Sequence, residues 1–288
     1  MIAVCPNPYR DNQLELTRSC VSLLQEAGFS AVVCPVFAEP GDDVIPQDLP
    51  LAPLSELDED LSLAVVIGGD GTVLSVVHTI PVRPVPLLGV NLGTMGFMTS
   101  LEPEDLVLVV KAARGEYRIS SRMMIDITLY RDGEVILRDS ALNDAYIHGY
   151  GDTIRLHAMC DGQTITAFGG DGIIFSTPTG STGYSLSAGG PVVEPETDNI
   201  IVTPICAHTL LSRSLVFTGE DEVKIEIGRR GRITDDETAE IAFDGGRCFG
   251  LRMGDGVIIK RSDDVTRIVR LSKESFLDIL SRKMSGVM

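Results

Sequence analysis

The chain has 288 residues, 44% of them hydrophobic and 23% charged, with a formal net charge of −17 and an isoelectric point near 4.6. This length predicts about two domains, and the composition is that of a folded globular protein. A surface this acidic repels nucleic acid and the anionic face of a membrane, so we expect neither as a partner. No apolar run approaches the roughly 18 residues of a membrane span, and the first residues lack the basic region of a signal peptide. We therefore expect a cytoplasmic protein.

The cysteines are dispersed along the chain, and none of them forms a Cys-x-x-Cys pair. A chain of this size does not need disulfides to hold its fold together. We therefore expect reduced, mostly buried thiols, as in a cytosolic protein, at Cys5, Cys20, Cys34, Cys160, Cys206 and Cys248.

Strand and helix patterns alternate through the first third of the chain. Short apolar runs predict strands at 2–5, 31–36, 61–67 and 87–90. An apolar stripe predicts a helix over 12–27 that Gly28 ends, and a second helix is predicted at 105–114. This alternation predicts a doubly wound α/β domain with ligands at the carboxyl ends of its strands.

The hydrophobic period changes from that of a helix to two near residue 120. Ile125, Ile127 and Leu129 alternate with polar residues, and Asp132-Gly133 follows as a tight-turn signal. Similar alternating runs recur further along the chain. We therefore predict an α/β domain over 1–118, a β-rich domain over 119–269 and a last helix within 270–288.

The segment Gly68-Gly69-Asp70-Gly71-Thr72 directly follows the most apolar predicted strand. Its glycines allow a tight turn and a close approach to a phosphate, and the helix that follows offers free N–H groups. An aspartate at this position can hold Mg²⁺ or take a proton from a hydroxyl. The segment is neither a Walker A loop nor the dinucleotide fingerprint. The alternative is an ordinary strand-to-helix turn with Asp70 as its cap.

Two further turns carry polar residues. Asn91-Leu92-Gly93 with Gly96-Phe97 follows the next strand, and a plain tight turn with Phe97 in the core is favoured for it taken singly. Asn143-Asp144 offers a donor and several acceptors, which suit a sugar hydroxyl or an adenine edge. An ordinary turn between strands is the favoured alternative there.

The run from Gly169 to Pro191 is rich in glycine, serine and threonine. A flexible linker has this composition, but it has no use for the apolar residues at 173–175, Tyr184 and Leu186, which we expect to be buried anchors. The run therefore predicts an ordered loop whose exposed hydroxyls and amides, without cations, surround a polar nucleotide. Its sequence contains no Gly-x-Ser-x-Gly, so a serine hydrolase is not supported.

Two isolated features complete the set of candidates. Phe243-Asp244-Gly245-Gly246 predicts a hairpin turn, with Asp244 as a possible ligand contact. His208 follows Cys206-Ala207, and a lone histidine of this kind is expected to be a hydrogen-bonded core residue more often than a catalyst.

Taken in order, these segments resemble the NAD kinase family, specifically its bacterial branch. The first glycine turn alone is a weak signal, since diacylglycerol and sphingosine kinases have similar turns. The run from Asp171-Gly172 through Ser187 is highly specific, and the resemblance spans most of the chain.

The resemblance implies a Rossmann-like N-terminal domain, a β-rich NAD-binding domain and a C-terminal helix that packs back on the first domain. It implies phosphorylation of the 2′-hydroxyl of the adenosine ribose of NAD, with ATP or polyphosphate as donor. It also implies a homodimer or homotetramer with NAD bound at a subunit contact. Mg²⁺ is expected to be held mainly through the nucleotide.

The resemblance also assigns roles to individual residues. Asp70 is implied to be the catalytic proton acceptor, with Tyr184 against the adenine and Asp171 at the nicotinamide-side ribose or amide. Further NAD contacts are implied for Gly71, Phe97, Asn143, Asp144, Thr182, Gly183, Ser187, Cys206 and Ala207. Phosphate or loop positions are implied for Gly68, Gly69, Thr72, Gly180 and Ser181, and possible contacts for Asp244 and His208.

Three positions depart from the family pattern. Asp144 stands where glutamate is common, and Gly183 where alanine is common. Gly169 stands where a basic residue sometimes contacts the nucleotide phosphates. Without that residue, we expect Mg²⁺ to offset the charge of the triphosphate.

Two other functions are compatible with parts of the pattern. A lipid kinase would share the first glycine turn, but the charge of −17 argues against a membrane-facing surface. A non-catalytic NAD sensor would have lost the acidic residue at the centre of the site, and Asp70 is present. The sequence leaves open the preferred donor, the use of NADH and the oligomer size.

Overall fold

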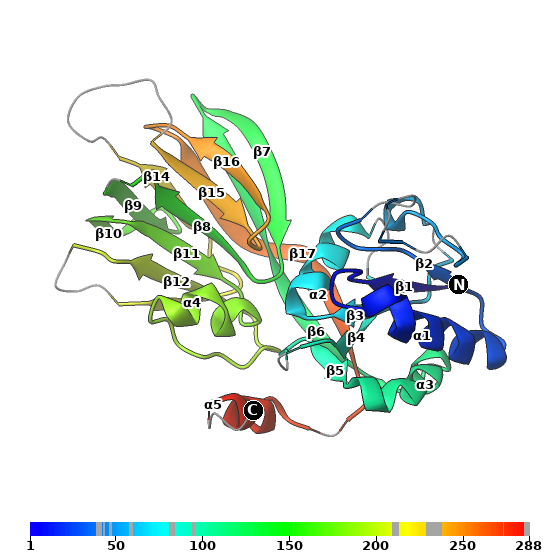
Figure 1. Ribbon diagram of the computed structural model, residues 1–288. Coiled ribbons are helices and arrows are strands. Elements are labelled where there is room, and N and C mark those ends of the chain that lie inside the picture. Colours follow the sequence, from blue (N-terminus) through cyan, green and yellow to red (C-terminus); the bar gives the residue numbers. More distant parts are fainter. Residues whose placement is uncertain are drawn as a thin grey trace. The chain divides into compact units, whose positions relative to one another are not determined.

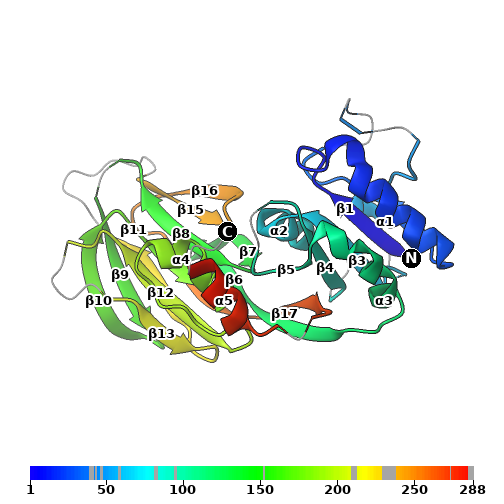
Figure 2. The same cartoon turned by 60° about the horizontal axis from the view of Figure 1, so that its bottom comes forward.

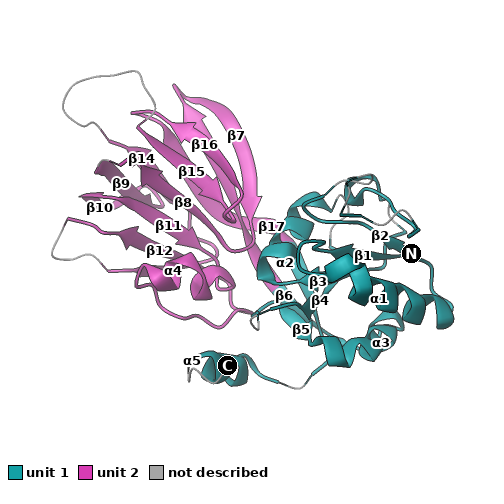
Figure 3. Cartoon of the chain, viewed as in Figure 1, with its two compact units in different colours: residues 1–121, 265–288 teal, residues 122–264 magenta. Residues whose placement is uncertain are grey.

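The computed structural model describes residues 1–38, 42, 44–45, 48–57, 60–80, 84–93, 96–151, 153–208, 213–228, 238–272 and 274–284. The chain forms two compact units (Figure 3). The first comprises Met1–Ser121 and Val265–Met288, and the second comprises Arg122–Asp264. The first unit is thus made of two separate stretches of chain.

A parallel sheet forms the centre of the first unit, in the order β2-β1-β3-β4 (Figure 1). Its register pairs Gly68 with Asn91, so the turns that follow β3 and β4 leave the sheet at the same level. The bounds of its strands are β1 (Ile2–Pro6), β2 (Ala31–Val33), β3 (Leu63–Gly68) and β4 (Pro86–Asn91), with β5 (Thr99–Leu101) pairing with β4.

Helices cover this sheet (Figure 2). The α-helices are α1 (Glu15–Glu26), α2 (Asp70–Thr79), α3 (Val109–Ala113) and α5 (Phe276–Met284), and the 3-10 turns are η1 (Asn12–Leu14), η2 (Leu54–Glu56) and η3 (Pro103–Leu108). The helix predicted over 12–27 is α-helical only from Glu15, because Leu14 has a φ of 54°. The helix predicted at 105–114 is divided between the end of the 3-10 turn η3 and the short α-helix α3.

The core of the first unit is made of aliphatic side chains. Every residue of β1 and β3 is buried, as expected of parallel strands covered on both faces. The predicted stripe of α1 is buried at Cys20, Val21 and Leu24, which share one core cluster with residues of α3 and β3. None of the helices in the described parts of the chain is long and apolar enough to cross a membrane.

The second unit is a sandwich of antiparallel strands. One sheet has the order β13-β12-β11-β8-β15-β16, and the other contains β10-β9-β14-β17 and the β6–β7 pair. Side chains of both sheets form one core that includes Ile127, Phe175 and Phe243. The strands of the first sheet are β8 (Asp144–Gly149), β11 (Gly172–Ser176), β12 (Asn199–Ile205), β13 (Leu215–Thr218), β15 (Ala239–Phe243) and β16 (Arg247–Leu251). Those of the other are β6 (Arg118–Arg131), β7 (Glu134–Ala141), β9 (Ile154–Cys160), β10 (Gln163–Gly170), β14 (Val223–Ile227) and β17 (Gly256–Arg270).

Strands β6 and β17 each contain residues of both units. The end of β17 belongs to the first unit, where Arg267 and Ile268 pair in parallel with Pro86 and Leu87 of β4. An α/β unit and a β-rich unit are present, so the predicted fold class is confirmed.

Candidate active site

The glycine turn between β3 and α2 is held by the Thr72 side chain. Thr72 Oγ1 accepts a hydrogen bond from the Gly69 N–H at 3.4 Å and one from the Asn7 side-chain amide at 3.5 Å. A Cβ atom at Gly68 would collide with this hydroxyl, so the position requires glycine. Among the described residues, no acceptor takes the N–H groups of Asp70 and Gly71, which begin α2. These two groups are therefore available to an anion.

The Asp70 side chain joins the two glycine turns of the first unit. Its carboxylate accepts the backbone N–H groups of Phe97 at 2.8 Å and Met98 at 3.0 Å. A Cβ atom at Gly96 would overlap this carboxylate. The Phe97 carbonyl in turn accepts a hydrogen bond from the Arg270 guanidinium at 2.7 Å. The Phe97 side chain is only half-buried, so its predicted place in the core is wrong.

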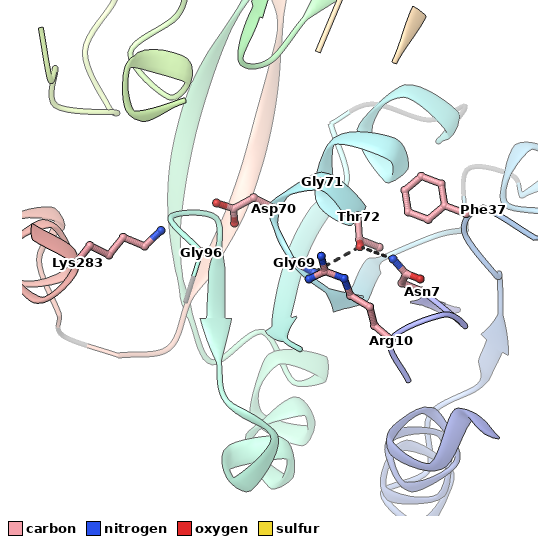
Figure 4. A pocket seen from close by; sticks show the side chains of 9 residues that line it. All are labelled: Asn7, Arg10, Phe37, Gly69, Asp70, Gly71, Thr72, Gly96 and Lys283. Carbon is pink, nitrogen blue, oxygen red and sulfur yellow. Dashed lines mark hydrogen bonds between the residues drawn. The ribbon is translucent and has the colours of Figure 1, made fainter. Parts of the chain in front are cut away.

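A pocket of about 310 Å³ lies over these turns (Figure 4). Two cations line it. Arg10 donates from Nη1 to the Leu92 carbonyl at 3.1 Å, and the same atom lies close to both Gly69 and Gly93. Lys283 points toward Asp70 from the opposite side of the pocket (Figure 4).

The Lys283 amine lies 4.0 Å from the centroid of the Phe97 ring, which itself packs 5.8 Å from Phe276 of α5. Lys283 is exposed, but partial burial lowers the pKa of its ammonium group. The Asp70 carboxylate opposes that shift. The pocket therefore combines one carboxylate, two cations and a helix N-terminus.

Four residues that line this pocket were not predicted from the sequence: Asn7, Arg10, Phe37 and Lys283. A signal was present for the first two, because they follow β1 at the same sheet edge as the glycine turns. Nothing in the sequence pattern connects Lys283 with a turn some 200 residues earlier. Arg10 and Lys283 therefore add two side-chain cations to the Mg²⁺ that was expected to offset the charge of the triphosphate.

The second unit holds Asn143 and Asp144 in a fixed turn before β8. Asp244, in the hairpin turn between β15 and β16, accepts the backbone N–H groups of Leu142 at 2.8 Å, Asn143 at 2.7 Å and Asp144 at 3.0 Å. The predicted hairpin turn at Asp244 is confirmed. The role of its carboxylate in holding another turn was not foreseen.

Both side chains of the Asn143-Asp144 turn lie beneath Gly183. Asp144 is buried, and burial together with the neighbouring Asp244 carboxylate raises its pKa to about 7. The side-chain oxygen of Asn143 is buried, and no donor among the described residues reaches it. A buried acceptor without a donor points to a ligand that supplies one.

The loop between β11 and β12 contains two short helical turns, η4 (Gly180–Thr182) and α4 (Tyr184–Ser187). Its hydroxyls were expected to be exposed, and several are buried instead. Ser181 donates to the Pro178 carbonyl at 2.7 Å, and the Ser185 and Thr203 hydroxyls lie 3.0 Å apart. These hydroxyls hold the loop itself, since a buried hydroxyl needs an internal partner. The loop also has a cation beside it, because buried Arg122 donates to Thr179 at 3.5 Å.

A second pocket, of about 500 Å³, opens beside this loop within the second unit. Tyr184 is exposed over 42% of its area and meets the Tyr146 ring edge-on, with 5.0 Å between centroids. Tyr184 and Leu186 were predicted to be buried anchors, and both are exposed, whereas Ile173 to Phe175 are buried as predicted. The residues that line this pocket are Tyr146, His148, Gly149, Gly151, Asp171, Tyr184 and Ile205.

The remaining predicted site residues of the second unit differ in exposure and in their contacts. Thr182 donates to the Thr179 carbonyl at 3.4 Å, and Ser187 is exposed at the end of α4. Ala207 packs closely against Gly170. His208 is exposed, so its predicted burial in the core is wrong. A hydrogen bond to Asp171 raises the pKa of the exposed Cys206 thiol.

Half of the thiols follow the prediction of burial. Cys5, Cys20 and Cys34 are buried, whereas Cys206 and Cys248 are exposed and Cys160 is intermediate. All are free thiols.

A helix N-terminus at a glycine turn, a fixed carboxylate and two cations are groups that suit phosphoryl transfer. Residues 2–113 match the model of the ATP-NAD kinase N-terminal domain, and residues 122–271 match that of the C-terminal domain. The chain belongs to the NAD kinase family.

Relatives named NAD kinase match along most of the chain. The one from Lachnoclostridium phytofermentans is 36% identical over 97% of both chains. The one from Acetivibrio thermocellus is 36% identical over 98% of this chain and 96% of its own. The one from Geotalea daltonii is 38% identical over 80% of each chain. The predicted resemblance to bacterial NAD kinases is confirmed, and nothing supports the lipid-kinase or sensor alternatives.

Two solved structures share the fold. The structure of yeast NADH kinase complexed with NADH has a TM-score of 0.86 at 24% identity, covering 99% of this chain and 87% of its own. The structure of an NAD kinase from Archaeoglobus fulgidus in complex with ATP has a TM-score of 0.73 at 22% identity, covering 99% of each chain.

Proposed function

We propose that this chain transfers the terminal phosphoryl group of ATP to the 2′-hydroxyl of the adenosine ribose of NAD, giving NADP. Family membership supports the overall reaction. The observation that carries the residue assignment is the pocket over the glycine turn, where Asp70, Arg10 and Lys283 meet the N-terminus of α2.

Phosphoryl transfer needs positioning and charge stabilisation more than strong covalent catalysis. The N–H groups of Asp70 and Gly71 bind oxygens of the donor triphosphate, and Arg10 and Lys283 offset its charge. The ribose oxygen bonds to the terminal phosphorus as the bond from that phosphorus to the bridging oxygen of the leaving diphosphate breaks. Asp70 orients the hydroxyl and accepts its proton.

The donor set of the pocket fits a magnesium ion that arrives with the triphosphate. Among the described lining residues, Asp70 is the single carboxylate, and Mg²⁺ is commonly bound by one or two carboxylates together with substrate phosphates. Asp70 would be its protein ligand, and the ion would neutralise charge that develops on the transferred group.

The second unit is proposed to be the NAD-binding domain. The exposed Tyr184 ring offers a face for the adenine. The buried side-chain oxygen of Asn143 needs a hydrogen-bond donor, and the amino group of the adenine is one. Asp171 is proposed for the hydroxyls or amide on the nicotinamide side. Contacts with the dinucleotide are also proposed for Thr182, Gly183, Ser187, Cys206 and Ala207, with His208 as a further contact.

The remaining proposals concern the protein in the cell. The acidic composition and the free thiols support a cytoplasmic location. A homodimer or homotetramer is proposed from the family resemblance alone.

The test is NADP formation from NAD, ATP and Mg²⁺, with wild-type protein beside Asp70→Asn. The variant keeps one acceptor oxygen for the Phe97 turn but loses the charge and the base, so turnover should fall on the order of 10³-fold or more. Asp105→Asn, at an exposed position of the same unit, is the matched control and should retain wild-type turnover. Turnover by Asp70→Asn within about tenfold of wild type would remove Asp70 from this role.

A further inference from the structure

The position of the Asp70 carboxylate is tied to the backbone at residues 96–98, the Phe97 turn. The carboxylate accepts the N–H groups of Phe97 and Met98, so a shift of this turn moves the oxygens proposed to accept the proton. The two are in close contact, because a Cβ atom at Gly96 would overlap the carboxylate. Whatever holds the Phe97 turn therefore also sets the place of the base.

Arg270, the last residue of β17, holds the Phe97 turn from its carbonyl side. The guanidinium donates to the carbonyls of Phe97 at 2.7 Å and Thr99 at 3.2 Å, and to the Ser100 hydroxyl at 3.2 Å. Ser100 in turn donates to the Val269 carbonyl at 2.6 Å. Because a guanidinium is planar and its donors have fixed directions, it fixes the relative positions of the oxygens that it binds.

The strand that carries Arg270 is firmly placed in the first unit. Arg267 and Ile268 pair in parallel with β4, and Val269 is fully buried in the core of this unit. Arg270 itself is half-buried beside β5. Its guanidinium therefore links the central sheet to the turn that contacts Asp70.

We propose that Arg270 is a positioning residue for phosphoryl transfer, and that it acts on Asp70 through Phe97. The carbonyl of Phe97 binds the guanidinium and the N–H of the same residue binds the carboxylate, so a single residue connects the two side chains. Arg270 is not among the described residues that line the glycine-turn pocket. The inference rests on the proposed function, since it requires Asp70 to be the proton acceptor.

The alternative role for Arg270 is structural support of β5 alone. Loss of such support lowers the free energy of unfolding, but it leaves the turnover of the folded enzyme unchanged. Loss of a positioning residue lowers kcat, because proton transfer and phosphoryl transfer both depend on the geometry of the reacting groups. The two roles therefore differ in kcat rather than in stability.

Steady-state kinetics of Arg270→Met test the proposal. Methionine keeps an unbranched aliphatic chain but removes every donor. A misplacement of about 1 Å can cost on the order of 10²-fold in rate, so kcat should fall about tenfold to 10²-fold. The KM values for ATP and NAD should stay within about twofold, because no substrate contact is removed. Arg270→Lys keeps the charge and a donor for the Phe97 carbonyl, and its kcat should lie between those of Arg270→Met and wild type.

Arg267→Met is the matched control, since Arg267 is exposed on the same strand. It should retain the wild-type kcat. Thermal melting of each variant shows that the protein measured is folded. If Arg270→Met does not fold, Arg270→Lys takes its place in all comparisons, with the same direction of change in kcat.

A double-mutant cycle with Asp70→Asn separates positioning of the base from any other effect. If Arg270 acts through the carboxylate, Arg270→Met should lower kcat much less in the Asp70→Asn background than in wild type. Equal fold losses in the two backgrounds, or a wild-type kcat in the folded Arg270 variant, would overturn the proposal. Wild-type turnover by Asp70→Asn would instead contradict the proposed function itself.

Discussion

The Asp70 carboxylate is a fixed group, since its two hydrogen bonds with the Phe97 turn hold it against rotation. Its negative charge lies in the same pocket as the Lys283 ammonium and the Arg10 guanidinium. An acidic protein that binds a triphosphate benefits from this arrangement, because the cations act at short range while the net charge acts over the whole surface.

Lys283→Met tests the cation of α5. The substitution keeps the length of the side chain and its contact with Phe97 but removes the charge. A charge-assisted hydrogen bond contributes about 1.5–3 kcal/mol, so the KM for ATP should rise roughly tenfold or more. The KM for NAD should change much less.

Lys111→Met, on the exposed face of α3, is the matched control and should leave both constants at wild-type values. An unchanged KM for ATP in Lys283→Met would show that α5 does not contact the donor.

At the scale of single residues, sequence patterns located turns better than side-chain environments. The glycine turn at Gly68 was predicted because its residues are contiguous. The exposure of Tyr184 and His208 was not, because local sequence does not specify which face of a short helix or loop meets solvent. Lys283 depends on tertiary contacts made by the far end of the chain.

At the scale of elements, the hairpin turn of β15 and β16 serves as a clamp. Asp244→Ala would leave three backbone N–H groups of the turn before β8 without their acceptor. We expect a loss of about 2–3 kcal/mol in the free energy of unfolding and a raised KM for NAD, because Asn143 and Asp144 lose their support.

The Asp-Gly hairpin between β6 and β7 supplies a matched control for this clamp. Asp132 has a φ of 52° and Asp244 a φ of 46°, so both substitutions to alanine impose the same backbone strain. Asp132→Ala should leave the KM for NAD at the wild-type value. Equal effects of the two substitutions on unfolding and on KM would contradict the clamp.

The strands of both units were predictable, since buried parallel strands and half-buried antiparallel strands have distinct hydrophobic periods. The helix predicted at 105–114 is α-helical only in its second half, because its first part is a 3-10 turn with nearly the same spacing of apolar residues. Pairing across the chain, such as Ile268 with Leu87, also left no sequence signal.

At the scale of the whole molecule, stability depends on pH through Asp144. Its folded pKa of about 7 lies above the ordinary value of 3.8, because burial disfavours the charge. The folded protein keeps a proton that the unfolded chain releases. Its contribution to stability is therefore complete below pH 3.8 and is lost as the pH rises through about 7.

The asparagine of the Asp144→Asn variant is uncharged at every pH, so the variant does not lose stability at this position as the pH rises. Between about pH 5 and pH 8, the variant should gain roughly 2–3 kcal/mol in the free energy of unfolding relative to wild type. Urea unfolding of both proteins at the two pH values measures the gain. The same difference between the two proteins at both values would show that Asp144 is charged in the folded state.

The discontinuity of the first unit bears on how the protein is made in the cell. Translation proceeds from the N-terminus, so the ribosome completes all of the second unit before Arg267 and Ile268 are available to pair with β4. Lys283 reaches the glycine-turn pocket later still. Domains usually fold in the order of their synthesis, but here the earlier unit waits for the later one. A nascent chain that stops after residue 264 therefore lacks both the β17 residues that pair with β4 and the Lys283 side of the glycine-turn pocket.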